Sequence, residues 1–374
     1  MSAELPLSLA QPAPPPTKAE GAQVRLLDGG AEAYPRMLQA IESATRRVHL
    51  EVYTFEREGV GSSFLAALAA AAQRGVEVRV IVDGWGSIGE SSAIQATLRA
   101  AGAKVRVYNP LTSLFTGRAW RNHRKILLVD ERVAFIGGIN IGDDYLGSEG
   151  EPGWADLVLE LSGDICVQLG AKLQAGRVEL ASGPVRVLLS GFGGGRRLRQ
   201  RYLEAIYRAK KQVVLAHAYF LPDRGFMHAL NRAAKRGVSV ELLLAGRSDV
   251  VFARAATMRL YRYFLRGGVR IHEWTASTLH AKAAVVDGRR LLVGSFNLDP
   301  LSLVNLETLV DVEDEAVAAQ AMAWLEKHLR SARPILLEHC KRTGLQAWLL
   351  DILGLAGARL SEAFANFMGR KRRR

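Results

Sequence analysis

Hydrophobic positions along this chain form short apolar runs separated by longer amphipathic stretches. Six apolar runs predict buried strands, at residues 48–53, 77–83, 104–108, 213–218, 239–245 and 269–273. Hydrophobic residues at helical spacing predict helices near residues 60–74, 91–101, 225–236 and 252–266. The alternation of strands with helices predicts an α/β fold with parallel strands in its sheets.

The same order of elements occurs twice. In residues 70–80, and again in residues 233–242, a helix ends at a glycine and a strand follows directly. This repeat predicts two halves, residues 22–180 and 198–335, joined by a linker at 181–197 that contains several glycines and a proline. The length of 374 residues leaves room for two domains with cores of their own.

Both ends of the chain differ from the halves in composition. Residues 1–21 hold five prolines, which predicts a disordered leader and not a signal peptide. Residues 336–374 are apolar at helical intervals and end in five basic residues. They predict an interfacial helix with a polybasic end that binds anionic membrane, or else a helix docked on the core with a solvated tail.

Composition also restricts the location and the partners. The chain has no run of eighteen apolar residues, and its two cysteines, Cys166 and Cys340, indicate neither a disulfide framework nor a zinc site. A cytoplasmic location is the default expectation. The net charge of +13 indicates an anionic partner. A cluster of Arg118, Arg121 and Arg124 is either a site for lipid headgroups or ordinary surface charge.

One polar motif occurs in both halves. Each copy contains a His, a Lys, an Asp and an Asn: His123, Lys125, Asp130 and Asn140 in the first half, and His280, Lys282, Asp287 and Asn297 in the second. The histidines are 280 − 123 = 157 residues apart, and the offsets within the two copies are identical. Packing alone gives little reason to repeat four polar residues at one spacing, so we interpret the copies as two parts of a catalytic site.

The sequence around each motif predicts a β-hairpin. The His and the Lys of one copy share a strand face, about 6.6 Å apart. The Asp lies seven residues after the His, where the chain turns, so we assign Asp130 and Asp287 to the turns. The returning strand brings an Asn back beside the His of its own copy.

A paired set of His, Lys and Asn suits phosphodiester chemistry without a metal or another cofactor. One histidine can accept a phosphoryl group while the other protonates the leaving oxygen, and the lysines and asparagines can bind the phosphate oxygens. Each histidine also needs an orienting carboxylate. The candidates follow the histidines at similar distances: Asp156 is 156 − 123 = 33 residues after His123, and Glu307 is 307 − 280 = 27 residues after His280.

The paired motifs resemble those of the phospholipase D superfamily, and most closely those of its bacterial cardiolipin synthases. The similarity extends over roughly residues 22–335 and is carried by residues 122–125, 218–222 and 294–302, with Asn305 and Glu307. It implies a metal-independent, ping-pong transfer of a phosphatidyl group, with His123 as nucleophile and His280 as general acid and base. The resemblance also implies that Lys125, Lys282, Asp130 and Asp287 are catalytic motif residues. For the two aspartates this is an alternative to the structural role in the turns.

The resemblance implies a fold, a substrate and a location as well. We expect two α/β halves with mixed sheets, packed about a pseudo-two-fold axis with the active site at their interface. The expected partners are anionic phospholipids, phosphatidylglycerol and cardiolipin, and the membrane surface. A peripheral position on the cytoplasmic side of the inner membrane follows. The segment Leu298-Asp299-Pro300 has no counterpart after Asn140, so the halves are not equivalent.

Three other functions remain open: hydrolysis of phospholipids by a phospholipase D, cleavage of nucleic acid, and binding of anionic membranes without catalysis. A basic surface suits DNA as well as lipid. Aromatic residues make up only 7% of the chain and no nucleic-acid module is recognisable, so nucleic acid is not the expected partner. Both motif copies are complete, which disfavours a binder without activity.

Overall fold

The computed structural model describes residues 17–340, except residues 20, 111, 113–119, 149, 174–176 and 248–250. The strands of the first half are β1 (Thr17–Ala19), β2 (Ala22–Asp28), β3 (Arg47–Val52), β4 (Glu77–Asp83), β5 (Lys104–Tyr108), β6 (Ile126–Val129), β7 (Val133–Gly137), β8 (Gly147–Ser148), β9 (Glu151–Pro152) and β10 (Leu157–Gly163). Its helices are α1 (Gly29–Glu42), α2 (Val60–Gln73), α3 (Ser91–Ala100) and α4 (Asp164–Lys172), with the 3-10 turn η2 (Asp143–Tyr145).

The second half contains the same kinds of element. Its strands are β11 (Val178–Ser182), β12 (Val185–Leu189), β13 (Gln212–His217), β14 (Ser239–Ala245), β15 (Arg270–Trp274), β16 (Lys282–Val286), β17 (Arg290–Gly294), β18 (Thr308–Glu313) and β19 (Arg333–Ile335). Its helices are α5 (Gly195–Arg208), α6 (Arg224–Lys235), α7 (Val251–Arg266) and α8 (Glu315–Ser331), with the 3-10 turns η3 (Leu301–Leu303) and η4 (Leu337–Cys340).

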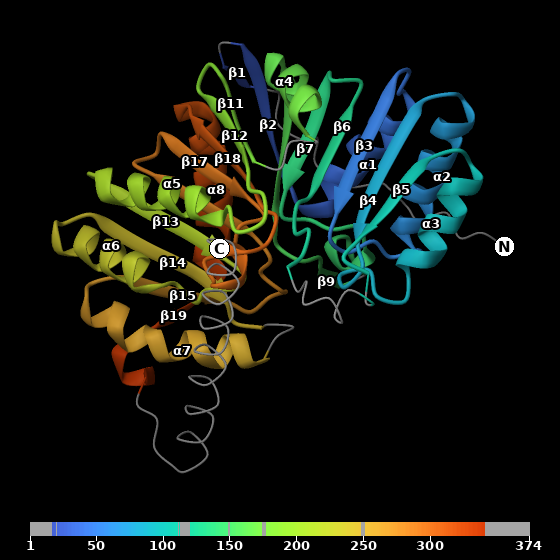
Figure 1. The fold of residues 1–374 in the computed structure, drawn as a ribbon. Helices are drawn as coiled ribbons and strands as arrows, with labels where there is room; N and C mark the ends of the chain where they lie inside the picture. Colours follow the sequence, from blue (N-terminus) through green and yellow to red (C-terminus); the bar gives the residue numbers. More distant parts are fainter. Residues whose placement is uncertain are drawn as a thin grey trace, which may run out of the picture.

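Each half is built on one large mixed sheet (Figure 1). The strand order is β1-β2-β10-β7-β6-β3-β4-β5 in the first sheet and β11-β12-β18-β17-β16-β13-β14-β15-β19 in the second. Apart from β19 at its edge, the second order repeats the first, which confirms the predicted duplication. Parallel pairing joins β3, β4 and β5, and likewise β13, β14 and β15, while the other pairs of the two large sheets are antiparallel.

The two predicted catalytic hairpins are present. Strand β6 returns through β7, and β16 returns through β17, with Ile126 opposite Ile136 and Ala283 opposite Val293. The second turn carries positive φ angles at Asp287 (54°) and Gly288 (65°), as a tight two-residue hairpin turn requires. The hairpins lie in the middle of their sheets, so they hold the motif residues on rigid strands.

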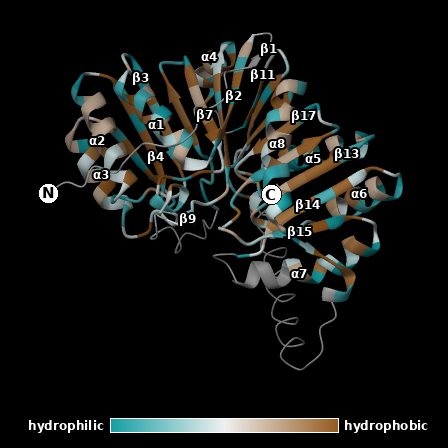
Figure 2. Cartoon of the chain, turned by 180° about the vertical axis from the view of Figure 1, so that it is seen from behind, coloured by the Kyte–Doolittle hydropathy of each residue, from teal (hydrophilic) through white to brown (hydrophobic). Residues whose placement is uncertain are grey.

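A shared core joins the two halves. Buried residues of β2, β6, β7 and β10 belong to the same cluster as residues of β12, β16, β17 and β18, and α8 packs against both groups. Trp324 of α8 donates its indole N–H to Asp28 at 2.7 Å, at the end of β2. Figure 2 shows the hydrophobic residues, in brown, along the strands of both sheets. The shared core therefore holds the two halves in one arrangement around any site at their interface.

The domain boundaries differ from those expected. Residues 17–19 of the predicted leader pair with β2 as an edge strand. Much of the predicted linker at 181–197 is structured, because Gly183-Pro184 is the turn of the β11–β12 hairpin and Gly195 begins α5. Glycine and proline occur in tight turns as well as in linkers, and the sequence did not separate the two.

The predictions for the two ends fall mostly outside the described residues. The rest of the leader, and residues 341–374 of the predicted interfacial helix and polybasic end, lie there. No helix in the described part of the chain is both long and apolar enough to cross a membrane.

Candidate active site

Two reciprocal backbone contacts align the halves at their interface. Asn122 forms a parallel bridge with Leu306, and the backbone N–H of His123 donates to the Leu306 carbonyl at 2.9 Å. In the opposite direction, the N–H of His280 donates to the Ala155 carbonyl at 2.8 Å. Each motif histidine therefore lies beside the carboxylate-bearing segment of the other half, as a pseudo-two-fold arrangement requires.

The carboxylates orient the histidines in crossed pairs. His123 Nδ1 lies 3.0 Å from Glu307 Oε2, and His280 Nδ1 lies 2.6 Å from Asp156 Oδ2. Distance along the sequence had associated each carboxylate with the histidine of its own half, and the structure reverses that association. With each Nδ1–H donated to a carboxylate, the Nε2 of each ring is left for chemistry.

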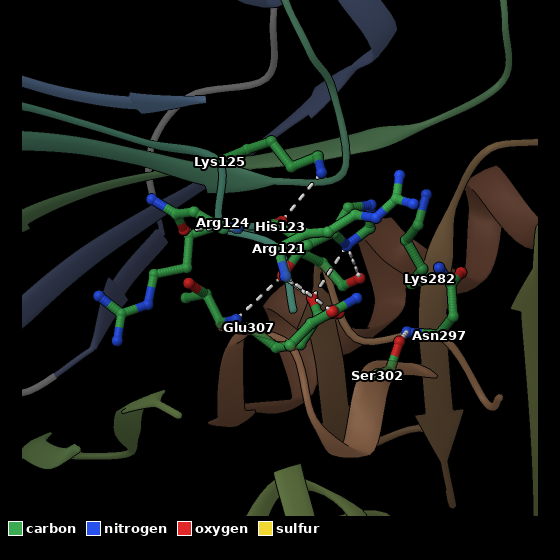
Figure 3. Close-up of polar contacts among 12 residues, drawn as sticks. Arg121, His123, Arg124, Lys125, Lys282, Asn297, Ser302 and Glu307 are labelled. Atoms are coloured by element: carbon green, nitrogen blue, oxygen red, sulfur yellow. Dashed lines mark hydrogen bonds and ion pairs between the residues drawn. The ribbon is translucent and has the colours of Figure 1, made fainter. Parts of the chain in front are cut away.

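Both lysines lie close to the histidines. Lys125 Nζ donates to the His123 carbonyl at 2.9 Å, and Lys282 Nζ lies 2.9 and 3.1 Å from the two ring nitrogens of His280. Figure 3 shows His123 between Lys125 and Lys282. Burial and these two lysines hold the pKa of His123 well below its usual range, and burial and Lys282 lower the pKa of His280 to about 4. Both imidazoles are therefore neutral at neutral pH.

The charges of the site favour an anion between the lysines. Burial, together with the charge of Lys282, holds the pKa of Lys125 well below its usual range. Burial raises the pKa of Glu307 to about 8, although Lys125 opposes the rise. A phosphate placed here adds negative charge beside both ammonium groups and both imidazoles, so it favours their protonated forms.

Aromatic side chains form part of the wall around each histidine. The Tyr53 ring lies 5.1 Å from that of His123, edge to face. The rings of Tyr145 and Trp154 each lie 5.5 Å from that of His280, and the Tyr145 hydroxyl lies 3.2 Å from its Nδ1. Sequence reasoning missed these three residues, because all of them follow strands in segments without a repeated motif.

The two motif asparagines have different surroundings. Asn140 donates from Nδ2 to the Tyr145 hydroxyl at 2.9 Å and accepts from the Thr54 N–H at 3.2 Å, so Tyr145 connects it with the histidine of the other half. Asn297 Oδ1 is buried without a hydrogen-bond partner, and Figure 3 shows this side chain next to Lys282. An amide oxygen of this kind can accept a hydrogen bond from a substrate hydroxyl but cannot bind a phosphate oxygen, so phosphate binding by Asn140 and by Asn297 stays a prediction.

The motif aspartates lie at the turns, as the hairpin geometry predicted, and not in the catalytic site. The Asp130 carboxylate accepts three backbone N–H groups, from Thr45, Arg46 and Arg47, at 2.8 to 2.9 Å. The Asp287 carboxylate accepts the N–H groups of Lys210, Lys211 and Gln212 at 2.7 to 3.1 Å. Both carboxylates fasten the hairpin turn to the start of the neighbouring strand, β3 or β13, which pairs antiparallel with the hairpin. These contacts are structural, and the catalytic role that the resemblance implies for the two aspartates stays a prediction.

The halves differ next to the orienting carboxylates. A Cβ added to Gly138 would lie 2.3 Å from Asp156 Oδ1, so only glycine leaves room for that carboxylate. The corresponding residue of the second tail is Ser295, whose hydroxyl donates to Glu307 Oε2 at 2.5 Å. The shorter side chain, that of Asp156, thus lies against a glycine, and the longer one, that of Glu307, against a serine.

The predicted arginine cluster is divided. Arg121 donates to the Tyr53 hydroxyl at 2.6 Å and lies 4.7 Å from the Trp85 ring, beside the site. Arg124 is buried, donates to the Ser190 carbonyl at 2.7 Å and lies 3.6 Å from the Glu51 carboxylate. The partners of Arg124 are therefore structural and lie on the side of the chain away from His123. Arg118 lies outside the described residues.

Comparison with known proteins agrees with this geometry. Residues 37–156 and 202–329 match the family model described as cardiolipin synthase, PLD-like domain. Cardiolipin synthase B of Shigella flexneri is 37% identical, with 79% of this chain and 77% of that protein covered. Cardiolipin synthase 1 of Bacillus anthracis is 28% identical, with 87% and 72% covered.

A solved structure shows the same fold. Phosphatidylserine synthase of Haemophilus influenzae Rd KW20 matches with a TM-score of 0.71 at 16% identity, covering 95% of this chain and 96% of that one. The predicted fold class and the resemblance of the paired motifs are both confirmed. The chain belongs to the cardiolipin synthase family with a PLD-like domain, within the phospholipase D superfamily.

Proposed function

We propose that the protein transfers a phosphatidyl group to phosphatidylglycerol through a covalent phosphohistidine and so forms cardiolipin. It is a phosphatidyltransferase of the phospholipase D superfamily. The observation that carries the proposal is the pair of crossed contacts, which holds two neutral histidines, each with its Nδ1 fixed, beside two lysines. The cardiolipin synthases among the relatives support phospholipids as the substrate class.

In the first step, His123 is the nucleophile. Its Nε2 attacks the phosphorus of the donor lipid, the phosphorus–oxygen bond to the headgroup alcohol breaks, and His280 gives a proton to the departing oxygen. Glu307 accepts the Nδ1–H of His123. Burial raises the pKa of Glu307 to about 8, and the positive charge that develops on the His123 ring favours the carboxylate form, which in turn stabilises that charge. His280 acquires its proton when the phosphate binds, because the anion offsets the charge of Lys282 that depresses its pKa.

In the second step, the phosphohistidine is resolved. A hydroxyl of phosphatidylglycerol loses its proton to His280 and attacks the phosphorus, and the phosphorus–nitrogen bond to His123 breaks. Lys125, Lys282 and the Nδ2 group of Asn297 donate hydrogen bonds to the phosphate oxygens in both steps, while Asp156 holds His280 in position. When phosphatidylglycerol is also the donor, the alcohol released in the first step is glycerol.

The proposed reaction takes place at the surface of an anionic membrane, with the protein bound peripherally on its cytoplasmic side. The net charge of +13 supports this location, because basic residues near an anionic leaflet contribute about 1 kcal/mol each. Raising the salt concentration should therefore weaken binding to vesicles.

The test is incubation of the purified protein with phosphatidylglycerol vesicles in the presence of a chelator, followed by mass spectrometry of the lipids. Cardiolipin and glycerol in equal amounts are the expected products. Phosphatidic acid with glycerol would identify a hydrolase, in which water takes the place of the acceptor. Absence of lipid turnover, with cleavage of a nucleic-acid substrate instead, would contradict the proposal.

A further inference from the structure

The two sheets differ in how one of their faces is covered. In the second half, α8 has 17 residues and packs on β14 and β15 as well as on the central strands. Its counterpart α4 has 9 residues and packs on β10 and β11. In the first half, α2 packs on β4 and α3 packs on β5, and their side of the sheet carries the apolar residues Val78, Val80 and Val105. The opposite face of β3, β4 and β5 lines a hollow of about 880 Å³.

This hollow lies behind the nucleophile and is separate from the active site. Its walls include Asn122, Arg124 and Leu306. Adjacent side chains of an extended segment point to opposite sides. His123 therefore points toward the active site, whereas its neighbours Asn122 and Arg124 point toward the hollow. Glu307, directly after Leu306, likewise bonds to His123 on the catalytic side. The hollow and the active site share one wall.

The lining of the hollow is strongly basic. One acidic residue and five basic residues line it: Glu51, with Arg79, Arg99, Lys104, Arg106 and Arg124. Some of these cations are neutralised, since Arg79 and Lys104 lie 2.6 and 3.2 Å from the Glu77 carboxylate and Arg124 lies 3.6 Å from that of Glu51.

Two arginines in the lining are not neutralised. Arg99 and Arg106 have no carboxylate partner within the part of the chain that the structure describes. Arg99 donates to the carbonyl of Val105 at 2.9 Å, which places its guanidinium at the strand position next to Arg106. The Arg106 guanidinium lies 5.6 Å from the ring of Tyr108. The hollow therefore presents two neighbouring guanidinium groups to a ligand.

We propose that this hollow is a second lipid site, which binds the phosphate of an anionic phospholipid at Arg99 and Arg106. Guanidinium groups bind phosphate oxygens in a bidentate manner. Apolar residues in the same lining, Ile81, Leu173 and Phe192, provide contacts for the acyl chains. A volume of about 880 Å³ lies within the range of ligand sites and is larger than a free phosphate needs. This site does not depend on the proposed reaction.

The test measures binding without turnover. The full-length chain with His123→Ala is titrated with dihexanoyl phosphatidylglycerol, below the concentration at which it forms micelles, by calorimetry. The same titration is made after adding Arg106→Glu, and after adding Arg132→Glu as a control at an exposed position of the β6–β7 turn. Dihexanoyl phosphatidylcholine and glycerol 3-phosphate serve as ligands that lack the net charge and the acyl chains, respectively.

The parent is expected to bind phosphatidylglycerol at two kinds of site, the hollow and the active site. Arg106→Glu should weaken one of the two sites about tenfold or more, the change expected for loss of a charge-assisted hydrogen bond, and leave the other unchanged. The Arg132→Glu control should keep both. A single site that Arg106→Glu does not affect would overturn the proposal, and equal binding of glycerol 3-phosphate at the second site would replace the lipid with a free phosphate. If the Arg106→Glu variant does not fold, Arg106→Gln is titrated in its place, and the same weakening of one site is expected.

Discussion

His123 and Glu307 are 184 residues apart in sequence, yet His123 Nδ1 and Glu307 Oε2 lie 3.0 Å apart across the interface of the two halves. The reciprocal pair, His280 and Asp156, meets at 2.6 Å. In neither half does the motif histidine contact the orienting carboxylate of the same half. Catalysis therefore requires both halves to be folded and packed. The two carboxylates support different roles, Glu307 that of the nucleophile His123 and Asp156 that of the general acid and base His280.

The two carboxylates should respond differently to the leaving group of the donor. Asp156→Asn should slow transfer from phosphatidylglycerol about 100-fold or more, because His280 is then poorly held as the general acid. A phosphatidyl donor with p-nitrophenol as leaving group needs no general acid, so this variant should then release nitrophenol in the first turnover at close to the wild-type rate. The measurement is the nitrophenol burst in a stopped-flow instrument.

Glu307→Gln is the matched comparison for that experiment. This variant should stay slow with both donors, since the nucleophile itself is affected. If the good leaving group rescued Glu307→Gln and not Asp156→Asn, the roles of the two histidines would be exchanged.

Gly138→Ala should reproduce the effect of Asp156→Asn. The added Cβ would lie 2.3 Å from Asp156 Oδ1, so the carboxylate must move and its bond to His280 is lost. Turnover should fall at least about tenfold with phosphatidylglycerol, and with the p-nitrophenol donor the rate of the first-turnover burst should recover. A fall that the better leaving group does not relieve would show that the methyl group disturbs the site more widely.

Asp130→Asn should lower stability and leave the chemistry nearly intact. The carboxylate accepts three backbone N–H groups, and hydrogen bonds to a charged group contribute about 1.5–3 kcal/mol. We expect the free energy of unfolding in urea to fall by about 2 kcal/mol and kcat to stay within about twofold at 25 °C. Glu58→Gln, at an exposed position, is the control. A loss of kcat comparable with that of His123→Ala would support the catalytic assignment of Asp130.

His217 should make the protein less stable in mild acid. Burial and the charge of Lys282 lower its pKa to about 3 from the ordinary value of 6.5, and neither ring nitrogen has a hydrogen-bond partner. Below pH 6.5 the unfolded chain takes up a proton that the folded protein excludes, so stability falls as the pH drops. At pH 5 the penalty is on the order of 2 kcal/mol.

His217→Leu removes this penalty. Urea unfolding at pH 7 and pH 5 should show a smaller loss of stability between the two pH values in the variant than in the wild type. An equal loss in both would mean that His217 is protonated in the folded protein.

The sequence predicted the parallel strands and the hairpins well, because local patterns specify them. Strands β4 and β5 have the expected boundaries, since buried apolar residues alternate within them. The turn role of Asp287 followed from its position before Gly288 alone. The β11–β12 hairpin was missed because Gly183-Pro184 has the composition of a linker as much as of a turn.

The active site could be predicted only in part, because its connections are tertiary. Repetition of the motif identified the histidines and lysines, but which carboxylate reaches which histidine depends on how the two sheets pack. The role of Tyr145 depends in the same way on a loop that brings its hydroxyl to His280 and Asn140. No pattern within one half contains that information.

The most direct test of the account is to trap the covalent intermediate. The His280→Ala chain is mixed with the p-nitrophenol phosphatidyl donor, quenched in alkali after one turnover, digested, and analysed by mass spectrometry. Because the first step needs no general acid with this donor and the second step lacks its base, a phosphatidyl adduct should accumulate on the peptide that contains His123. The His123→Ala chain should show no adduct. An adduct on His280 in the His123→Ala chain, with none on His123 in the other variant, would contradict the assignment of the nucleophile.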